Sequence, residues 1–189
     1  MHTACKERAG GMLTLVGLEE ATVQHLCLQC REALPGSELC IANYLFPKGY
    51  VVSGSKEAVT LMRERASGLE ATIKEVPVSG AFHSTLMTSA VSRLQKGLAS
   101  ADITLPRLPV YSNVTGLPYS NSADIRVHLA EQITRPVLWE GTVQNMIERE
   151  GGESELSFVE VGPGRQLRAM LKRINKDSFR KCINFEASK

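Results

Sequence analysis

The sequence predicts an α/β fold in two parts. Three observations support this class: strand-like and helix-like segments alternate along the 189 residues, the first of them follow a β-α-β-β-α-β order, and glycine or proline separates several of them. With 43% hydrophobic residues, the chain can bury a sizeable core. A net charge of +2 does not indicate nucleic-acid binding. No apolar run is long enough to cross a bilayer, so no membrane partner is expected.

Residues 1–10 are expected to be the remnant of a helix. Lys6, Glu7 and Arg8 favour a helix, and the pair Gly10-Gly11 ends it. Because the chain opens within this helix, it is expected to lack its beginning. The segment resembles neither a signal peptide nor a transit peptide.

Residues 11–78 are expected to form a ferredoxin-like unit, because their elements follow the β-α-β-β-α-β order. Apolar residues at helical spacing predict the first helix, and turn residues over 46–49 separate two short strands. Ser55 is placed to cap the second helix. The expected elements are a strand over 11–16, a helix over 19–34, strands over 39–44 and 50–53, a helix over 55–67 and a strand over 71–78.

Residues 79–189 are expected to form the second part, a parallel sheet covered by helices, with the boundary at Ser79-Gly80. Gly151 to Glu155 is expected to be a polar surface loop. The expected elements are helices over 84–101, 123–133, 137–150 and 165–175, a buried strand over 109–113, and strands over 156–161 and 183–185.

His83 is the first candidate for chemistry. It follows Gly80, which permits an unusual turn, at the point where an expected strand gives way to a helix. Sites in α/β folds gather at the carboxyl ends of strands, and an imidazole can move protons near neutral pH. The local sequence by itself favours the alternative, a structural histidine at a helix N-terminus that is bonded to a backbone carbonyl.

Other segments carry polar or basic residues, each with a structural alternative. Asn113 can contact a ligand or close a turn, and Gln132 can offer an oxygen to an imidazole or end a helix before Pro136. The glycines within 162–164 can admit an anion or form a tight turn. One face of the following helix is basic and can meet an acidic partner or remain solvated. Its residues are Arg165, Arg168, Lys172 and Lys176.

The cysteines indicate neither a disulfide framework nor a metal site. Their number, five, is odd, and disulfide-rich domains carry paired cysteines. Cys27 and Cys30 form a lone C-x-x-C motif, but a zinc site would need a second ligand pair, so two core thiols are predicted. The sequence also contains no G-x-S-x-G motif and therefore no nucleophile elbow.

Three ordered blocks resemble the malonyl-CoA:acyl-carrier-protein transacylase family, and above all its animal mitochondrial form. The resemblance covers nearly all of the chain. The blocks are Val78-Ser-Gly-Ala-Phe-His-Ser84, Gln132-Ile-Thr-Arg-Pro-Val-Leu-Trp139 and Phe158-Val-Glu-Val-Gly-Pro-Gly164, with further matches at Asn43-Tyr44, Val51-Val-Ser-Gly54 and Tyr111-Ser-Asn-Val114.

The resemblance implies an α/β-hydrolase-like subdomain, incomplete here, with a ferredoxin-like insert. It also implies malonyl transfer from malonyl-CoA to the phosphopantetheine thiol of acyl carrier protein in fatty acid synthesis, through a malonyl-serine ester. His83 is then the base and Gln132 the residue whose main-chain carbonyl steadies it. Asn43, Asn113 and Arg165 are expected near the substrate. A mitochondrial monomer without cofactor or metal is expected.

The chain departs from the family at its front. The family's G-H-S-x-G serine, its malonate-binding arginine and its oxyanion loop lie upstream of the position of Met1, and Leu45 stands where a second polar residue is frequent. The complete protein is therefore expected to be the enzyme, and this chain alone to be inactive. Two alternatives are a non-catalytic form that binds carrier protein or coenzyme A, and a small-molecule-binding domain that leaves the three blocks unexplained.

Overall fold

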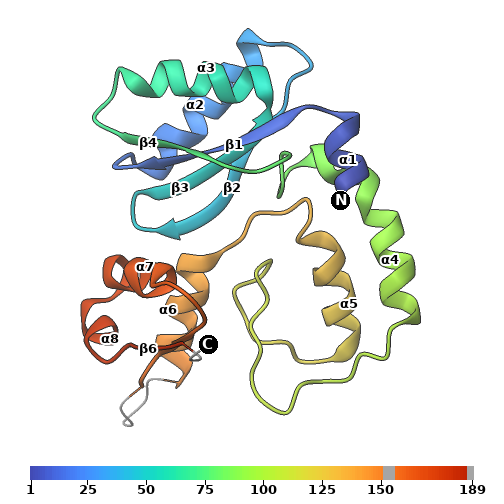
Figure 1. Cartoon of the computed structure of the whole chain (residues 1–189), viewed down its shortest axis with the longest axis vertical. Helices are drawn as coiled ribbons and strands as arrows, with labels where there is room; N and C mark the ends of the chain where they lie inside the picture. Colours follow the sequence, from blue (N-terminus) through green and yellow to red (C-terminus); the bar gives the residue numbers. More distant parts are fainter. Residues whose placement is uncertain (151–155, 187–189) are drawn as a thin grey trace.

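The computed structural model of the chain describes residues 1–150 and 156–186. Figure 1 shows a sheet covered by two helices at one end of the molecule, with two groups of helices beneath it. We call these parts the sheet lobe (residues 10–76), the α4–α5 lobe (85–131) and the C-terminal lobe (139–186). None of the helices in the described ranges is both long and apolar enough to span a membrane.

The sheet lobe contains the predicted β-α-β-β-α-β order. Its strands pair in the order β2-β3-β1-β4, and every pair is antiparallel. A short helix, α1 (His2–Glu7), precedes it. Its elements are β1 (Gly10–Val16), α2 (Glu20–Ala33), β2 (Leu39–Phe46), β3 (Gly49–Ser55), α3 (Lys56–Ser67) and β4 (Thr72–Val76).

The main core lies between the sheet and its two helices. The apolar residues of α2 recur at helical spacing, so one stripe of the helix faces the strands. The prediction of core thiols is confirmed, because Cys27 and Cys30 are 3% and 0% exposed. Other core residues are Leu13, Leu15, Val23, Leu39, Val52, Val59 and Met62.

Ser55 is the N-cap residue of α3, as predicted, but its side chain makes no capping hydrogen bond to the helix. Its hydroxyl accepts a hydrogen bond from the Glu38 N–H at 2.8 Å and donates to the Glu38 carbonyl at 3.2 Å. The end of β3 is thereby tied to the residue before β2. A Cβ at Gly54 would collide with the same carbonyl, which explains the glycine at this close approach.

The remaining chain forms the two helical lobes. The helix predicted over 84–101 begins as a 3-10 helix, and the one predicted over 137–150 starts two residues later; α8 was not predicted. The elements are η1 (Thr85–Ala90), α4 (Val91–Ser100), α5 (Ser122–Glu131), α6 (Trp139–Glu150), β5 (Val159–Val161), α7 (Gln166–Ile174), α8 (Lys176–Arg180) and β6 (Ile183–Phe185).

The prediction of a buried strand over residues 109–113 is wrong. The Ser112 N–H donates to the Leu117 carbonyl, and the Tyr119 N–H donates to the Val110 carbonyl, so the segment folds back on itself. Val110 is 46% exposed. A strand requires a neighbouring strand, and the described part of the chain places none beside this segment.

The expected helix-covered parallel sheet is also smaller than predicted. In the described residues it consists of β5 and β6, which pair in parallel. Of the strand predicted over 156–161, only residues 159–161 are assigned to β5. The loop predicted over Gly151 to Glu155 lies outside the described residues.

The segment 132–138 joins the helical lobes to the sheet lobe. The Tyr44 N–H donates to the Val137 carbonyl at 2.9 Å, and the Val137 N–H donates to the Ala42 carbonyl at 2.8 Å. An isolated parallel bridge between Asn43 and Val137 results. Figure 1 shows this segment passing beneath β2 on its way from α5 to α6.

Candidate functional site

His83 lies in the turn between β4 and η1, and its backbone is fixed in an uncommon conformation. Its φ is 60°, in the left-handed region that costs a residue with a side chain about 1 kcal/mol or more. The His83 N–H donates to the Ile133 carbonyl at 2.9 Å. This bond attaches the turn to the segment 132–138.

The imidazole of His83 bonds to the same segment. Its Nδ1 lies 2.6 Å from the Gln132 carbonyl oxygen and 3.2 Å from that of Arg135. Carbonyl oxygens only accept hydrogen bonds, so Nδ1 carries a proton, and in the neutral ring Nε2 then has a free lone pair. This is the tautomer that a general base acting through Nε2 requires.

His83 lines a cavity of about 380 Å³ between the sheet lobe and the segment 132–138. Most of the other lining residues come from α2, β2 and the residue that precedes β2. Most of the lining side chains are polar. They are Gln24, Cys27, Arg31, Glu38, Cys40, Ile41 and Tyr44, with Thr85, Thr134 and Pro136 beside His83.

Neither thiol in this cavity is activated. Burial, followed by the effect of Cys40, raises the pKa of Cys27 to about 12, and Arg31 opposes the shift. Burial, followed by the negative charge of Glu38, raises the pKa of Cys40 to about 11. Both groups are therefore protonated near neutral pH and are poor nucleophiles. The nucleophile that a base at His83 would serve has to be another group.

Three of the predicted site residues come together. Besides the bond from His83 to the Gln132 carbonyl, the Asn113 side-chain amide lies 3.4 Å from the Gln132 Oε1. The Asn113 carbonyl accepts from the Leu138 N–H at 2.9 Å. Residues 19 to 49 positions apart in the sequence thus meet around one segment.

The other two predicted residues lie in different places. Asn43 is half-buried in β2, next to Val137, and so adjoins the segment that holds His83. Arg165 is exposed in the turn before α7, in the C-terminal lobe. Within residues 1–150 and 156–186, no hydrogen bond or ion pair joins Arg165 to His83, Gln132 or Asn113.

The glycine turn before α7 does not offer an open anion site. The Glu160 carboxylate accepts from the Leu167 and Arg168 N–H groups, each at 2.9 Å, so an internal anion already fills this helix terminus. Gly162 and Gly164 have φ of 127° and 91°, which agrees with the tight-turn alternative. The sequence feature that could have indicated this contact is Glu160, an acidic residue just before the glycine turn that leads into α7.

Part of the basic face packs on aromatic rings within the molecule. The Arg168 guanidinium lies 4.8 Å and the Lys172 ammonium 5.5 Å from the centre of the Phe179 ring. Arg173, on the same helix, lies 4.6 Å from the centre of the Phe46 ring. No cluster of three potential metal ligands occurs among the residues that the structure describes.

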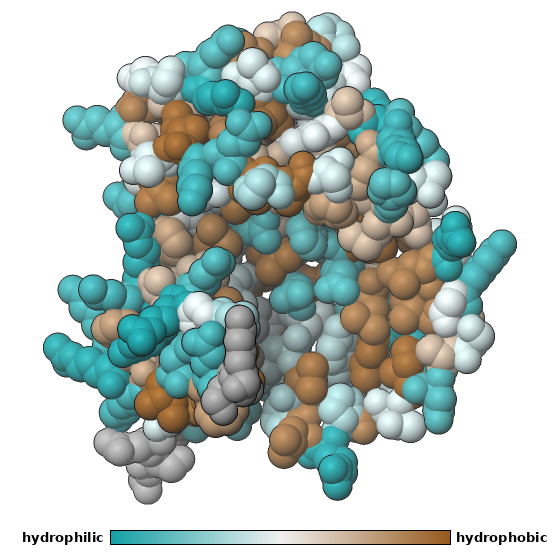
Figure 2. All heavy atoms as spheres, in the orientation of Figure 1, coloured by the Kyte–Doolittle hydropathy of each residue, from teal (hydrophilic) through white to brown (hydrophobic). Residues whose placement is uncertain are grey.

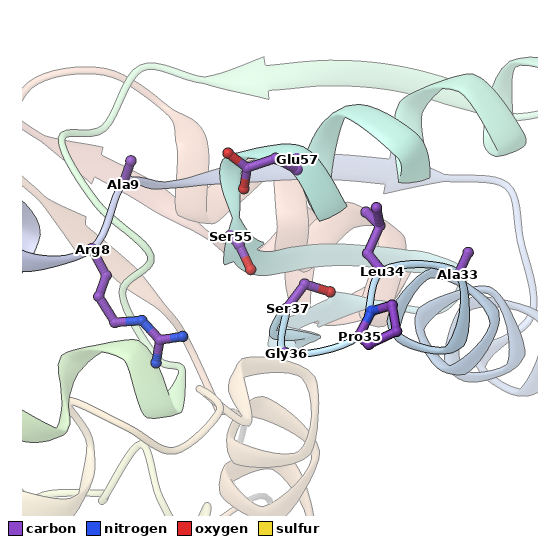
Figure 3. A pocket seen from close by; sticks show the side chains of 9 residues that line it. All are labelled: Arg8, Ala9, Ala33, Leu34, Pro35, Gly36, Ser37, Ser55 and Glu57. Atoms are coloured by element: carbon purple, nitrogen blue, oxygen red, sulfur yellow. The ribbon is translucent and has the colours of Figure 1, made fainter.

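A second cavity, of about 490 Å³, lies between the link from α1 to β1, the end of α2 and the start of α3 (Figure 3). Arg8 stands apart from Ser37 and Ser55 in this view, and Leu34 and Pro35 form the opposite side. No histidine or cysteine lines it. The cavity at His83 is therefore the stronger candidate site.

Comparison with known proteins identifies relatives over nearly the whole chain, although no protein-family model matches it. The mitochondrial malonyl-CoA-acyl carrier protein transacylase of Homo sapiens is 37% identical over 186 residues, which are 95% of this chain and 48% of the human protein. The chain spans about half the length of the curated relatives it matches.

Solved structures agree with the sequence relatives. The malonyl CoA-acyl carrier protein transacylase of Coxiella burnetii superposes with a TM-score of 0.84 at 31% identity, over 96% of this chain and 56% of that one. A malonyl-transacylase in complex with a type II PKS acyl-carrier protein also gives 0.84, at 25% identity, over 98% and 58% of the two chains.

Proposed function

We propose a function from one premise: the chain belongs to the malonyl-CoA-acyl carrier protein transacylase family, of which it spans about half the length. The proposed function is malonyl transfer from malonyl-CoA to the phosphopantetheine thiol of acyl carrier protein. In this proposal the chain supplies the histidine base, and the nucleophilic serine and malonate-binding arginine come from the part of the family that this sequence does not match. A mitochondrial location belongs to the same proposal, since the human relative is mitochondrial.

The observation that carries the proposal is the pairing of His83 Nδ1 with the Gln132 carbonyl at 2.6 Å. That bond leaves the lone pair of Nε2 for a proton from a hydroxyl or thiol. His83 also lines a cavity of about 380 Å³. Both features suit a base that receives its nucleophile from outside the described residues.

The proposed reaction has two balanced steps. First, the serine oxygen attacks the thioester carbonyl while His83 takes the hydroxyl proton; the C–S bond breaks, and the proton passes to the departing coenzyme A thiolate. Second, the carrier-protein thiol loses its proton to His83 and attacks the malonyl-serine ester. The C–O bond breaks, and the proton returns to the serine oxygen.

The proposed subdomains and binding residues follow the same reasoning. Residues 11–78 would be the ferredoxin-like small subdomain and 79–189 part of the α/β-hydrolase-like acyltransferase subdomain. Asn43 and Asn113 adjoin the segment that holds His83, and this proximity supports the proposal that they contact the acyl group. Arg165 lies in another lobe and is proposed only to contact the carrier protein or the coenzyme.

A chimera tests this function. The half of the human transacylase that matches this chain is replaced by it, and malonyl transfer from malonyl-CoA to holo-acyl carrier protein is measured. Transfer is expected, and His83→Ala is expected to lower kcat by about a hundredfold or more. Arg65→Gln in α3, away from His83, is the control. A folded chimera that is inactive, or one whose His83→Ala form keeps full activity, contradicts the proposal.

The exposed part of the basic face favours a second candidate, binding without catalysis. Arg165, Lys172 and Lys176 are all exposed on or beside α7, and such a face can attract phosphates or an acidic carrier protein. Titrating the chain with malonyl-CoA and with carrier protein measures this directly. Saturable binding that falls in Lys172→Gln and Lys176→Gln would support it, and no saturable binding would exclude it.

A further inference from the structure

We infer that Ser84 is a positioning residue for His83, because its hydroxyl closes the turn that holds the imidazole against the Gln132 carbonyl. The Ser84 hydroxyl donates a hydrogen bond to the Ala81 carbonyl at 2.6 Å. This bond spans Phe82 and His83, so it closes the turn in which His83 lies. The inference rests on the proposed function, since a positioned imidazole affects a reaction only where His83 acts as the base.

The hydroxyl of Ser84 does not have the role that its position in the chain favours. Ser84 is the N-cap residue of η1, and its carbonyl accepts a hydrogen bond from the Met87 N–H at 3.1 Å. A serine at an N-cap ordinarily bonds its hydroxyl to an N–H group of the first helical turn. The Ser84 side chain makes no such bond and points back to Ala81 instead. The start of the helix thus has no side-chain cap, and the turn before it gains a hydrogen bond.

Both ends of this bond are buried. The face shown in Figure 2 is hollowed between the lobes, yet Ser84 and Ala81 are only 1% and 2% exposed. Ala81 is also fixed by packing, because a Cβ added at Gly10 would lie 2.6 Å from the Ala81 Cβ. Removing the hydroxyl would take a donor from a buried carbonyl, which is costly. The turn would have to rearrange to recover a partner.

The turn needs this support because His83 has an uncommon backbone conformation. Its φ of 60° is unfavourable for a residue with a side chain and persists only where the surrounding structure fixes it. The His83 N–H donates to the Ile133 carbonyl at 2.9 Å, and the His83 carbonyl accepts from the Cys40 thiol at 3.8 Å. The Ser84 bond fixes the turn itself. Without it, His83 can relax to a right-handed or extended φ, which redirects the side chain away from Gln132.

Ser84 acts on His83 and not on a ligand. The described residues that line the His83 cavity do not include it. The segment 132–138 holds the ring through main-chain oxygens, which most side-chain substitutions leave in place. Ser84 is different, because here a side-chain oxygen makes the bond. Loss of this one atom would loosen the base while the imidazole, its carbonyl acceptors and the cavity remain.

Magnetic resonance of the His83 ring nitrogens tests the geometry in the full chain, without any reaction. In protein that contains isotope-labelled histidine, the wild type is expected to carry the His83 proton on Nδ1, and this proton is expected to exchange slowly with water. Ser84→Ala is expected to speed the exchange about tenfold and to populate the second tautomer, because one hydrogen bond of the turn is lost. Ser84→Thr keeps a hydroxyl and is expected to restore the wild-type spectrum.

Thr88→Ala is the matched control. The Thr88 hydroxyl donates to the Thr85 carbonyl at 2.6 Å, also three positions back, but this bond is exposed and lies within η1. Thr88→Ala is expected to leave the His83 spectrum unchanged. In the chimera, Ser84→Ala is expected to lower kcat about tenfold at an unchanged KM for malonyl-CoA, because fewer molecules hold the base in place.

The outcomes separate the two proposals. Unchanged ring exchange in Ser84→Ala, or the same change in Thr88→Ala, overturns the positioning role. So does an active chimera whose kcat Ser84→Ala leaves unchanged. If the alanine variant does not fold, Ser84→Cys, whose thiol is a weaker donor, is judged by the same two measurements. A ring that Ser84→Ala releases, in a chimera that transfers no malonyl groups, keeps the positioning role and contradicts the proposed function.

Discussion

The ring and the backbone of His83 are both held by one distant segment. The backbone N–H bonds to Ile133, and Nδ1 bonds to the carbonyls of Gln132 and Arg135. All three acceptors are main-chain oxygens, so side-chain identity in this segment matters less than its path. Pro136 supports that path, because the residue before a proline is restricted to extended conformations. The base is thus positioned by the backbone, which side-chain substitutions change little.

The positive φ of His83 leads to a stability prediction. His83→Ala and His83→Gly remove the same ring bonds, but only glycine adopts a φ of 60° without a Cβ penalty. We expect the glycine variant to be more stable than the alanine variant by about 1 kcal/mol. Urea denaturation of both measures the difference. An alanine variant of equal or greater stability would show that the left-handed conformation is not maintained in solution.

The buried thiol of Cys27 predicts a loss of stability in alkali. Burial raises its pKa from 9.0 to about 12, so above pH 9 the unfolded chain releases a proton that the folded chain keeps. The free energy of unfolding therefore falls as pH rises from about 9 towards 12, by up to about 1.4 kcal/mol per pH unit for this group. Denaturation under reducing conditions at pH 8, 9 and 10 measures the slope.

Cys27→Ala separates this contribution from others. Burial also raises the pKa values of Cys40, Tyr44 and Tyr50, and these groups lower the stability in alkali in the same direction. They do so in the wild type and in the variant, so the difference between the two slopes reports Cys27. Identical slopes below pH 10 would mean that this thiol is accessible to solvent in the folded protein.

Among the elements, α7 shows most clearly how a local motif is used structurally. Its first turn receives the carboxylate of Glu160 from β5, and this contact ties the strand pair to the helix. The helix then presents Leu171 to the small core of the C-terminal lobe. The N–H groups that follow this glycine turn could have bound an external anion. They bind a carboxylate of the same chain instead.

Glu160→Gln tests the structural role of this carboxylate. The amide keeps the shape but removes the charge that two N–H groups and the helix dipole stabilise. We expect a loss of about 1–2 kcal/mol in the free energy of unfolding and faster hydrogen exchange at Leu167 and Arg168. Glu148→Gln, at an exposed position of α6, should change stability by less than about 0.5 kcal/mol. Equal effects of the two substitutions would refute this role.

The molecule as a whole contains a candidate base that lines a cavity, but its sequence contains no G-x-S-x-G nucleophile elbow. A base without its nucleophile cannot form an acyl-enzyme. We therefore expect this chain, assayed alone, to transfer no malonyl groups from malonyl-CoA to carrier protein above background. The measurement is radiolabel transfer at saturating substrate. Turnover that disappears in His83→Ala would overturn the expectation and locate a nucleophile within the chain.

The sequence predicted most elements of the sheet lobe, and for a clear reason. Val23, Leu26 and Cys30 recur at helical spacing, and turn residues precede Gly49. Both patterns involve residues that are close together in the sequence, so they predict the helix and the turn without knowledge of the tertiary structure. The strand over 109–113 was mispredicted because its apolar pattern reports a tendency to be buried, whereas pairing requires a distant partner. The hydrogen bonds of the Ser55 hydroxyl were not predicted for a related reason, since its partner Glu38 lies 17 positions away.

By itself the sequence determined the types and order of most elements, the absence of a G-x-S-x-G motif, and three ordered blocks that point to one family. Only the tertiary structure decided that His83 Nδ1 meets the Gln132 carbonyl, that Asn113 joins them while Arg165 does not, and that Glu160 fills the start of α7. Helices and strands follow from the periodicity of adjacent residues. Hydrogen bonds across some 50 positions depend on where the chain crosses itself, which no local pattern specifies.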